Sequence, residues 1–253
     1  MLEILYEDTE VIVVNKSAGL VVHHDGRTKE VTLADLIIKK YPSIYGVGET
    51  ITLANGGIIE KWGIVHRLDR DTSGVILIAK TQESFLNLKA QFQVRIIQKS
   101  YRAIAYGWFK EEHGCINKPI GRSTSDFRKW SAEYGARGNL REAVTNYDVL
   151  GNNEQWIIDN EKDAEILKVS YLNVSPKTGR THQIRVHLKA IGHPILCDIL
   201  YAPKYSCPLF FGRTALHAFS IKFRNLSGIE NYVEAPLTSD FIHALAVLHV
   251  IHK

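Results

Sequence analysis

Five consecutive apolar residues, VILIA at positions 75–79, directly follow the polar residues Thr72, Ser73 and Gly74. A short, uninterrupted apolar run bounded by turn-forming residues is typical of a strand that is buried on both faces. Such a strand lies at the centre of a sheet, with other elements covering it. This run therefore constrains the fold more than any other feature, since the chain must build a covered β-sheet around it.

Other runs predict more strands than helices. Strands are expected at residues 11–14, 101–106, 147–150 and 166–174. Thr32 and Thr81 are placed to cap two helices, whose apolar faces reach Tyr41 and Phe92. Further helices are expected at 181–191, ended by Gly192, and at 241–251, started by Ser239. Residues 108–142 are rich in glycine and charge and predict long exposed loops. Because helices do not alternate regularly with strands, the pattern favours the α+β class over a doubly wound fold.

Composition is that of an ordinary globular chain. The 253 residues are 45% hydrophobic and 23% charged, which excludes disordered and fibrous classes. The net charge of +4 suits a polyanionic partner as well as many enzymes of small metabolites, so it decides no function. The acidic amino-terminal residues do not resemble a secretory signal, and no apolar run approaches the ~20 residues of a membrane span.

The three cysteines, Cys115, Cys197 and Cys207, form no CxxC pair. An odd number of cysteines argues against a closed disulfide framework. A reducing, cytoplasmic setting is therefore expected for this chain.

The densest polar cluster is HRLDRDTSG at residues 66–74, immediately before the apolar run. A turn at the end of a central strand is a rigid platform for a reactive side chain. Asp69 and Asp71 are both candidates for chemistry, and their spacing does not choose between them. The alternative is a surface turn stabilised by salt bridges.

A second cluster, TGRTHQIRVH at residues 178–187, falls on a predicted helix. Ile184, Leu188 and Ile191 form its inward stripe, and Arg185 lies about 100° from the leading residue of that stripe. From there the guanidinium could bind a carboxylate through two hydrogen bonds and keep it ionised. A surface arginine whose alkyl stem packs on the protein is the alternative.

A third cluster, KSYRAIAYG at residues 99–107, predicts a strand with Lys99 and Tyr101 on one face. A tyrosine can stack on a nucleobase and also offer a hydroxyl. Most tyrosines in strands are simply packed, so this cluster taken alone does not establish a site.

Together the three clusters, the second extended as TGRTHQIRVHLKAIGHPILCD, resemble the motifs of the RluA family of RNA pseudouridine synthases. Shorter matches occur in the family's order at NKSAGL (15–20), AVTNY (143–147), LHA (216–218) and EAPL (234–237). The resemblance extends from about residue 5 to residue 241. It implies the pseudouridine synthase fold, which is a mixed, largely antiparallel β-sheet with flanking helices and a central cleft.

The resemblance also implies roles for individual residues. The family's catalytic aspartate falls on Asp69, its active-site tyrosine on Tyr101, and the arginine that pairs with the aspartate on Arg185. Leu216 matches an apolar residue of the family's pocket, and Arg67 matches a motif arginine near the flipped nucleotide. We add Lys99, Arg180 and His182 as candidate phosphate contacts, for which solvated surface positions are the alternative.

The chain departs from the family's pattern in three respects. Ser17 stands where a proline is common, and Cys197 stands where a glycine is common, which could change the local backbone geometry. Many members that modify ribosomal RNA carry an S4-like RNA-binding domain before the catalytic part, and no such segment precedes the first motif here. We therefore expect one catalytic domain over residues 1–253.

The implied reaction breaks the bond between ribose C1′ and uracil N1, rotates the uracil and rejoins it through C5. No electron is gained or lost, so neither a redox cofactor nor a metal is expected. The target base must leave the stack to be reached. The expected partner is RNA, either tRNA or rRNA, and the protein is expected to act as a monomer.

Two other functions compete with this interpretation. One is an RNA-binding protein of the same fold that has lost catalysis, although all three residues that match the family's catalytic set are present. The other is a nucleoside hydrolase, which usually requires a second carboxylate or a metal. Asp71 is the only nearby candidate for that second carboxylate.

Overall fold

The computed structural model describes residues 2–24, 30–52, 56–133, 136–158, 164–208 and 211–248. The chain forms two compact units. The first comprises Met1–Lys99 and Ala218–Pro236, and the second comprises Ser100–His217 and Leu237–Lys253. The two units are described separately below, and one catalytic domain over the whole chain stays a prediction.

The first unit is built on a sheet that surrounds the predicted central strand. Its strands lie in the order β1 (Glu3–Glu7), β2 (Val11–Lys16), β5 (Ser73–Ala79), β13 (Leu216–Arg224, here from Ala218) and β14 (Glu230–Glu234). Every residue of β5 is buried, as the apolar run predicts. The unit also contains a hairpin of β3 (Thr50–Thr52) and β4 (Ile58–Glu60), and a 3-10 turn, Pro42–Ile44.

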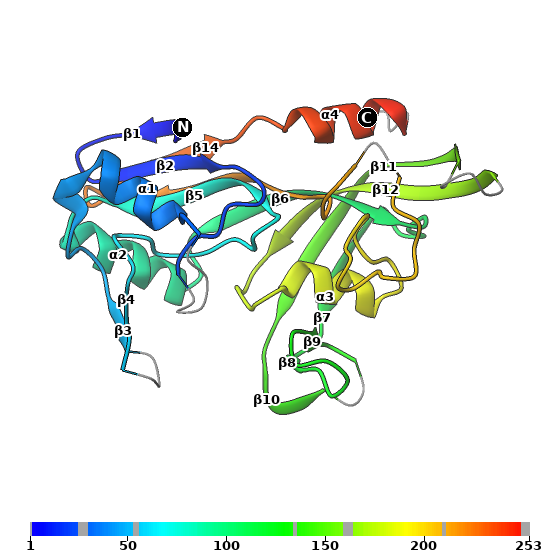
Figure 1. Cartoon of the computed structure of the whole chain (residues 1–253), viewed down its shortest axis with the longest axis horizontal. Coiled ribbons are helices and arrows are strands. Elements are labelled where there is room, and N and C mark those ends of the chain that lie inside the picture. The colour runs from blue at the N-terminus through cyan, green and yellow to red at the C-terminus, as the bar shows by residue number, and fades with distance from the viewer. Residues whose placement is uncertain are drawn as a thin grey trace. The chain divides into compact units, whose positions relative to one another are not determined.

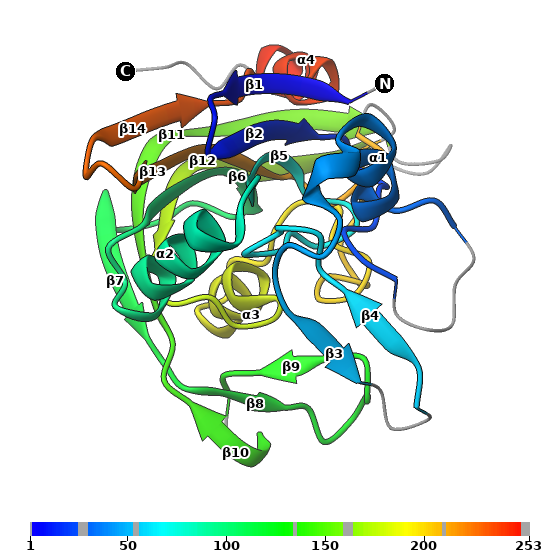
Figure 2. The same cartoon turned by 90° about the vertical axis from the view of Figure 1, so that its left-hand side faces the viewer.

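Two helices accompany this sheet, and α2 lies below its strands in Figure 1 and Figure 2. Helix α1 spans Leu33–Lys40 and α2 spans Gln82–Gln93. Both begin with a capping box, because the Thr32 hydroxyl accepts from the Asp35 N–H and the Thr81 hydroxyl from the Ser84 N–H. The two predicted caps are therefore confirmed.

The second unit has a sheet with the antiparallel order β6 (Gln98–Tyr106, here from Ser100), β12 (Ala164–Pro176), β11 (Val144–Ile158) and β7 (His113–Asn117). Figure 1 and Figure 2 both place α3 (Gln183–Ala190) and α4 (Ser239–Val247) on opposite faces of these strands. A small sheet of β10 (Arg137–Arg141), β8 (Ile120–Arg122) and β9 (Trp130–Ser131) lies beneath α3 in both views. The main apolar core of the unit includes Leu172, Leu188 and Phe241.

Both units are dominated by antiparallel strand pairs with few helices, so the predicted α+β class and largely antiparallel sheet are confirmed. No helix within the described ranges is long and apolar enough to cross a membrane.

Three predictions about individual elements are corrected. Residues 108–142 are not long loops, because β7, β8, β9 and β10 lie there. Strand β7 is held by hydrogen bonds to β11, which is distant in sequence, and β10 is exposed at every residue, so neither shows an apolar alternation. Helix α3 begins at Gln183 and not at Thr181, because His182 has a left-handed φ of 56°. Helix α4 begins at Ser239, two residues before the predicted Phe241, with Thr238 as its N-cap. It ends at Val247, and residues 249–253 lie outside the described residues.

The expectation of unpaired cysteines is also wrong. Cys197 and Cys207 form a disulfide, and only Cys115 among the three cysteines is free. The odd number of cysteines does not exclude this pair, because three cysteines allow one disulfide and one free thiol. Cys197 has a φ of 57°, a conformation that favours glycine, and this agrees with the glycine common at this position in the RluA pattern.

Candidate active site

Asp69 lies in a tight turn directly before β5. The Asp69 carbonyl accepts from the Thr72 N–H at 3.2 Å, and the neighbouring Arg70 carbonyl accepts from the Gly19 N–H at 2.9 Å. Gly74 follows with a φ of 110°, and a Cβ at this position would lie 2.0 Å from the Ala218 carbonyl oxygen. Only glycine permits this close approach, so the turn that carries Asp69 is fixed against its neighbouring strand.

Lys16 fastens the same turn from the other side. Its side chain is only 1% exposed, and its ammonium donates to the carbonyls of Ser17 at 2.9 Å, Leu20 at 2.8 Å and Arg70 at 2.8 Å. The NKSAGL segment is thereby tied to the HRLDRD turn. Sequence reasoning missed this role, although Lys16 lies within a matched motif and a lysine after an apolar run is unusual.

The remaining polar residues of this turn have different environments. His66 is half-buried, and its Nε2 accepts from the Leu77 backbone N–H at 3.0 Å. Burial, with a smaller effect from Lys99, lowers the pKa of His66 to about 3, so its ring is neutral at physiological pH. Arg67 is exposed.

Lys99 is the last residue of the first of the two segments that make up the first unit. Its ammonium lies 5.7 Å from the centre of the Phe92 ring, and that ring lies 5.1 Å from the ring of His66. Burial lowers the pKa of Lys99 to about 8, because loss of contact with water disfavours the charged ammonium.

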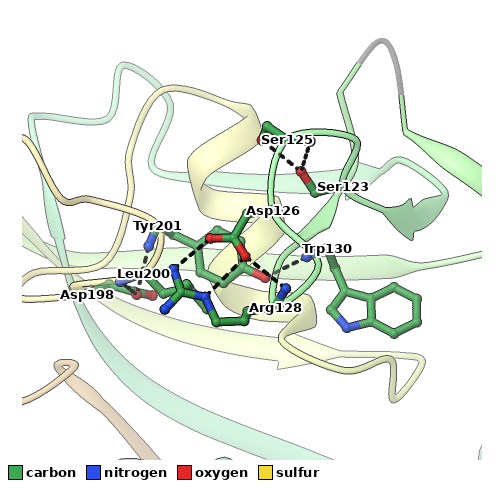
Figure 3. Close-up of polar contacts among 8 residues, drawn as sticks. All are labelled: Ser123, Ser125, Asp126, Arg128, Trp130, Asp198, Leu200 and Tyr201. Atoms are coloured by element: carbon green, nitrogen blue, oxygen red, sulfur yellow. Dashed lines mark hydrogen bonds and ion pairs between the residues drawn. The ribbon is translucent and has the colours of Figure 1, made fainter.

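Arg185 in the second unit has a buried partner that sequence reasoning missed. Its Nε and Nη2 donate to the two carboxylate oxygens of Asp198 at 2.6 and 2.8 Å. Asp198 is fully buried and also accepts from the Leu200 and Tyr201 N–H groups at 3.1 and 3.0 Å (Figure 3). The guanidinium lies 5.0 Å from the centre of the Tyr201 ring. These contacts fix both the position and the plane of the guanidinium.

The other proposed site residues of the second unit lie on its sheet and around α3. Tyr101 is half-buried in β6, opposite Val174. Leu216 is 4% exposed at the start of β13 and belongs to the apolar core. Arg180 donates through Nε to the Glu142 carbonyl at 3.0 Å.

His182 lies at the start of α3, and its Nδ1 is 2.9 Å from the Tyr201 hydroxyl. Tyr201 therefore links His182 to Arg185, and the second unit brings these two predicted residues together. The first unit carries Arg67, Asp69 and Lys99. Asp198 could have been found from the sequence, because it ends the GHPILCD part of the extended second cluster. No recognisable sequence signal marks Tyr201.

Among the residues that the structure describes, no group of three or more His, Cys, Asp or Glu side chains could hold a metal ion. The first unit contributes an aspartate in a turn before a buried strand, and the second unit contributes an arginine held by a buried carboxylate.

Residues 10–190 match the profile of the RNA pseudouridylate synthase family. The chain belongs to this family. An uncharacterized RNA pseudouridine synthase of Synechocystis sp. is 36% identical over 248 residues, which cover 98% of this chain and 69% of the relative. The ribosomal large subunit pseudouridine synthase D of Blochmanniella floridana is 32% identical over 98% of this chain and 73% of its own length. The chain is thus an RNA pseudouridine synthase of the RluA type, which is an isomerase.

Solved structures agree on the fold. Human RNA pseudouridylate synthase domain containing 4 is similar with a TM-score of 0.70 and 24% identity, over 98% of this chain and 94% of that chain. Human RNA pseudouridylate synthase domain containing 1 is similar with a TM-score of 0.66 and 23% identity, over 100% and 96% of the two chains. The predicted pseudouridine synthase fold is confirmed.

Proposed function

We propose that this enzyme converts uridine to pseudouridine in the RNA of the large ribosomal subunit. The observation that carries this proposal is the set of relatives named ribosomal large subunit pseudouridine synthase D. Those of Blochmanniella floridana, Pseudomonas aeruginosa and Neisseria meningitidis each align with 98% of this chain at 32%, 33% and 35% identity. Transfer RNA, which was equally open from the sequence, becomes an outcome that the experiment below can detect.

Asp69 is proposed as the group that starts the reaction as a carboxylate. It attacks ribose C1′, adds to the base or removes a proton from C2′, and these routes remain alternatives. In each of them the C1′–N1 bond breaks, the uracil rotates, C5 joins C1′ and the C5 proton is lost. The turn geometry supports this role, because the fastening of the Asp69 backbone allows the carboxylate to be presented in one orientation.

Arg185 and Tyr101 are proposed to assist Asp69. Arg185 keeps the Asp69 carboxylate ionised and oriented, and its own orientation is held by Asp198. Tyr101 stacks on the extruded uracil and assists removal of the C5 proton, while Leu216 provides an apolar wall for the base.

Arg67, Lys99, Arg180 and His182 are proposed to contact the RNA backbone near the flipped nucleotide. Cations that neutralise phosphates release counterions, so affinity should fall steeply with salt. We further propose that the enzyme acts in the cytoplasm as a monomer and requires neither a metal nor a cofactor, because isomerisation changes no oxidation state.

The test is to incubate the purified enzyme with unmodified large-subunit ribosomal RNA and, separately, with unmodified tRNA, both carrying tritium at uracil C5. We expect tritium release from the ribosomal RNA, with pseudouridine at a defined position by mass spectrometry. Tritium release from tRNA alone would overturn the ribosomal assignment. Binding without release would favour an inactive RNA-binding protein, and free uracil would favour a nucleoside hydrolase.

A further inference from the structure

A polar pocket of about 210 Å³ lies in the second unit, among the loop after β8, strand β9 and helix α3. Its wall carries hydroxyl groups of three serines and a threonine, the ammonium groups of Lys129 and Lys189, and the carboxylate of Glu133. Trp130 and Tyr201 complete the lining. The proposed catalytic residues do not line this pocket.

The loop that forms one wall is held in shape by its own hydrogen bonds. The Ser123 N–H donates to the Lys129 carbonyl at 3.1 Å, and the Ser123 and Ser125 hydroxyls are 3.0 Å apart (Figure 3). Arg128 donates through Nε and Nη2 to the Asp126 carboxylate at 3.1 and 2.8 Å. Hydrogen bonds from Arg128 lower the pKa of Asp126 to about 2, so this carboxylate is ionised and already paired. The wall is therefore preformed.

The floor of the pocket is connected to Arg185. Tyr201 is 4% exposed, and its hydroxyl accepts from the backbone N–H of Trp130 at 2.9 Å (Figure 3). The same side chain lies against Arg185, with 5.0 Å between the guanidinium and the ring centre. A group bound in the pocket is thus separated from the proposed active-site arginine by a single aromatic side chain.

The charges favour an anion in this pocket. Among the residues that the structure describes, Lys129 forms no ion pair, whereas Lys189 pairs with Glu133 at 2.6 Å. The latter two side chains are 41% and 46% exposed, and an exposed pair contributes only about 0–1 kcal/mol. An incoming phosphate can therefore replace Glu133 at Lys189 with little loss. The nearby hydroxyls can donate to phosphate or ribose oxygens.

We propose that this pocket binds the phosphate and ribose of an RNA nucleotide that flanks the target uridine. The inference rests on the proposed function, because RNA is the polyanion that this enzyme must hold next to Arg185. Lys129 binds the phosphate, which also replaces Glu133 as the partner of Lys189. The hydroxyl groups of the wall bind the ribose. The Arg122 guanidinium covers one face of the Trp130 ring, at 4.2 Å from the ring centre.

Two variants test the site by moving RNA affinity in opposite directions. Lys129→Gln removes a phosphate contact, so it should weaken binding about 5-fold and reduce the slope of log affinity against log salt by about 0.7. Glu133→Gln removes the competing charge and should tighten binding about 3-fold. Lys110→Gln is the matched control, because Lys110 is an exposed lysine of the same unit outside the pocket lining and should change affinity less than 2-fold.

The probe is fluorescein-labelled, unmodified large-subunit ribosomal RNA, with affinity measured by anisotropy at several KCl concentrations. Opposite shifts for Lys129→Gln and Glu133→Gln support the pocket. If both variants bind like the control, or both bind more weakly than the wild type, the pocket does not bind RNA and the inference fails. Pseudouridine formation by the wild type is measured on the same RNA. Its absence would contradict the proposed function whatever the affinities show.

Discussion

Lys16 in the first unit and Arg185 in the second are both buried cations, but they donate hydrogen bonds to different kinds of acceptor. Lys16 donates to three backbone carbonyls, which carry no net charge. Arg185 donates to both oxygens of a fully buried carboxylate, Asp198. The first arrangement fixes the backbone of a turn through its carbonyl groups. The second fixes a guanidinium by a complete ion pair.

This difference predicts unequal losses of stability when Lys16 is removed from the first arrangement and Asp198 from the second. Loss of Lys16 leaves neutral carbonyls without their donor, whereas loss of Asp198 leaves a buried positive charge uncompensated. An unpaired buried charge costs more than an unpaired neutral group. The following predictions test this comparison and the chemistry that the two cations support.

The largest effect on activity is expected for Asp69, the carboxylate in the turn that Lys16 holds. Asp69→Asn should reduce pseudouridine formation at least ~10⁴-fold, equivalent to about 5 kcal/mol of transition-state stabilisation, because the amide cannot act as the initiating carboxylate. Tritium release from C5-labelled RNA measures the loss. Thermal unfolding and RNA affinity should stay close to those of the wild type.

Asp71→Asn is the matched control, since it removes the other carboxylate of the same turn. It should retain most of the activity. If Asp71→Asn were inactive and Asp69→Asn active, the assignment of the catalytic aspartate would be reversed.

The next effect concerns the ion pair of the second unit. Asp198→Asn should lower the free energy of unfolding by about 3–5 kcal/mol, because Arg185 is only 9% exposed and would lose its counter-charge. Urea unfolding measures this change. Activity should fall as well, because the guanidinium is no longer held in one plane.

The double variant Asp198→Leu with Arg185→Met separates stability from activity. Removing both charges should recover most of the lost stability, because no unpaired charge remains. Activity should not recover with stability, because the guanidinium itself is gone. A double variant that regains activity would show that Arg185 has no role in the chemistry.

A smaller loss is expected in the first unit. Lys16→Met should reduce the free energy of unfolding by about 2–3 kcal/mol, less than Asp198→Asn, because the carbonyls that lose their donor are neutral. Lys39→Met, at an exposed lysine of α1, should change it by less than about 0.5 kcal/mol. Equal losses for Lys16→Met and Asp198→Asn in urea unfolding would contradict the comparison of the two cations.

The sequence predicts local features of both units better than it predicts long-range contacts. The caps at Thr32 and Thr81 and the buried strand β5 are encoded within a few residues, so they could be recognised without the fold. The pairing of Arg185 with Asp198 joins residues on either side of the end of α3 and depends on tertiary packing.

Errors in the sequence analysis have the same cause. The left-handed φ of His182 makes α3 begin at Gln183, so the helix does not reach back to Thr181 as predicted. Strands β7 to β10 receive their hydrogen bonds from partners in the sheet and carry no apolar alternation of their own. The bond between Cys197 and Cys207 depends on a loop geometry that a count of cysteines does not contain.

The smallest predicted effect concerns Lys99 and returns to the first unit, where burial has lowered a lysine pKa to about 8 from 10.5. The ammonium is therefore charged below pH 8 and becomes neutral as the pH rises through that value, while neighbouring His66 is neutral throughout because its pKa is about 3. If Lys99 contacts a phosphate, RNA affinity should fall by about 3-fold between pH 7 and pH 9. Lys99→Arg keeps its charge over this range and should show a flatter profile by anisotropy. Identical profiles for the wild type and Lys99→Arg would mean that the lowered pKa reflects burial alone and that Lys99 does not bind the RNA backbone.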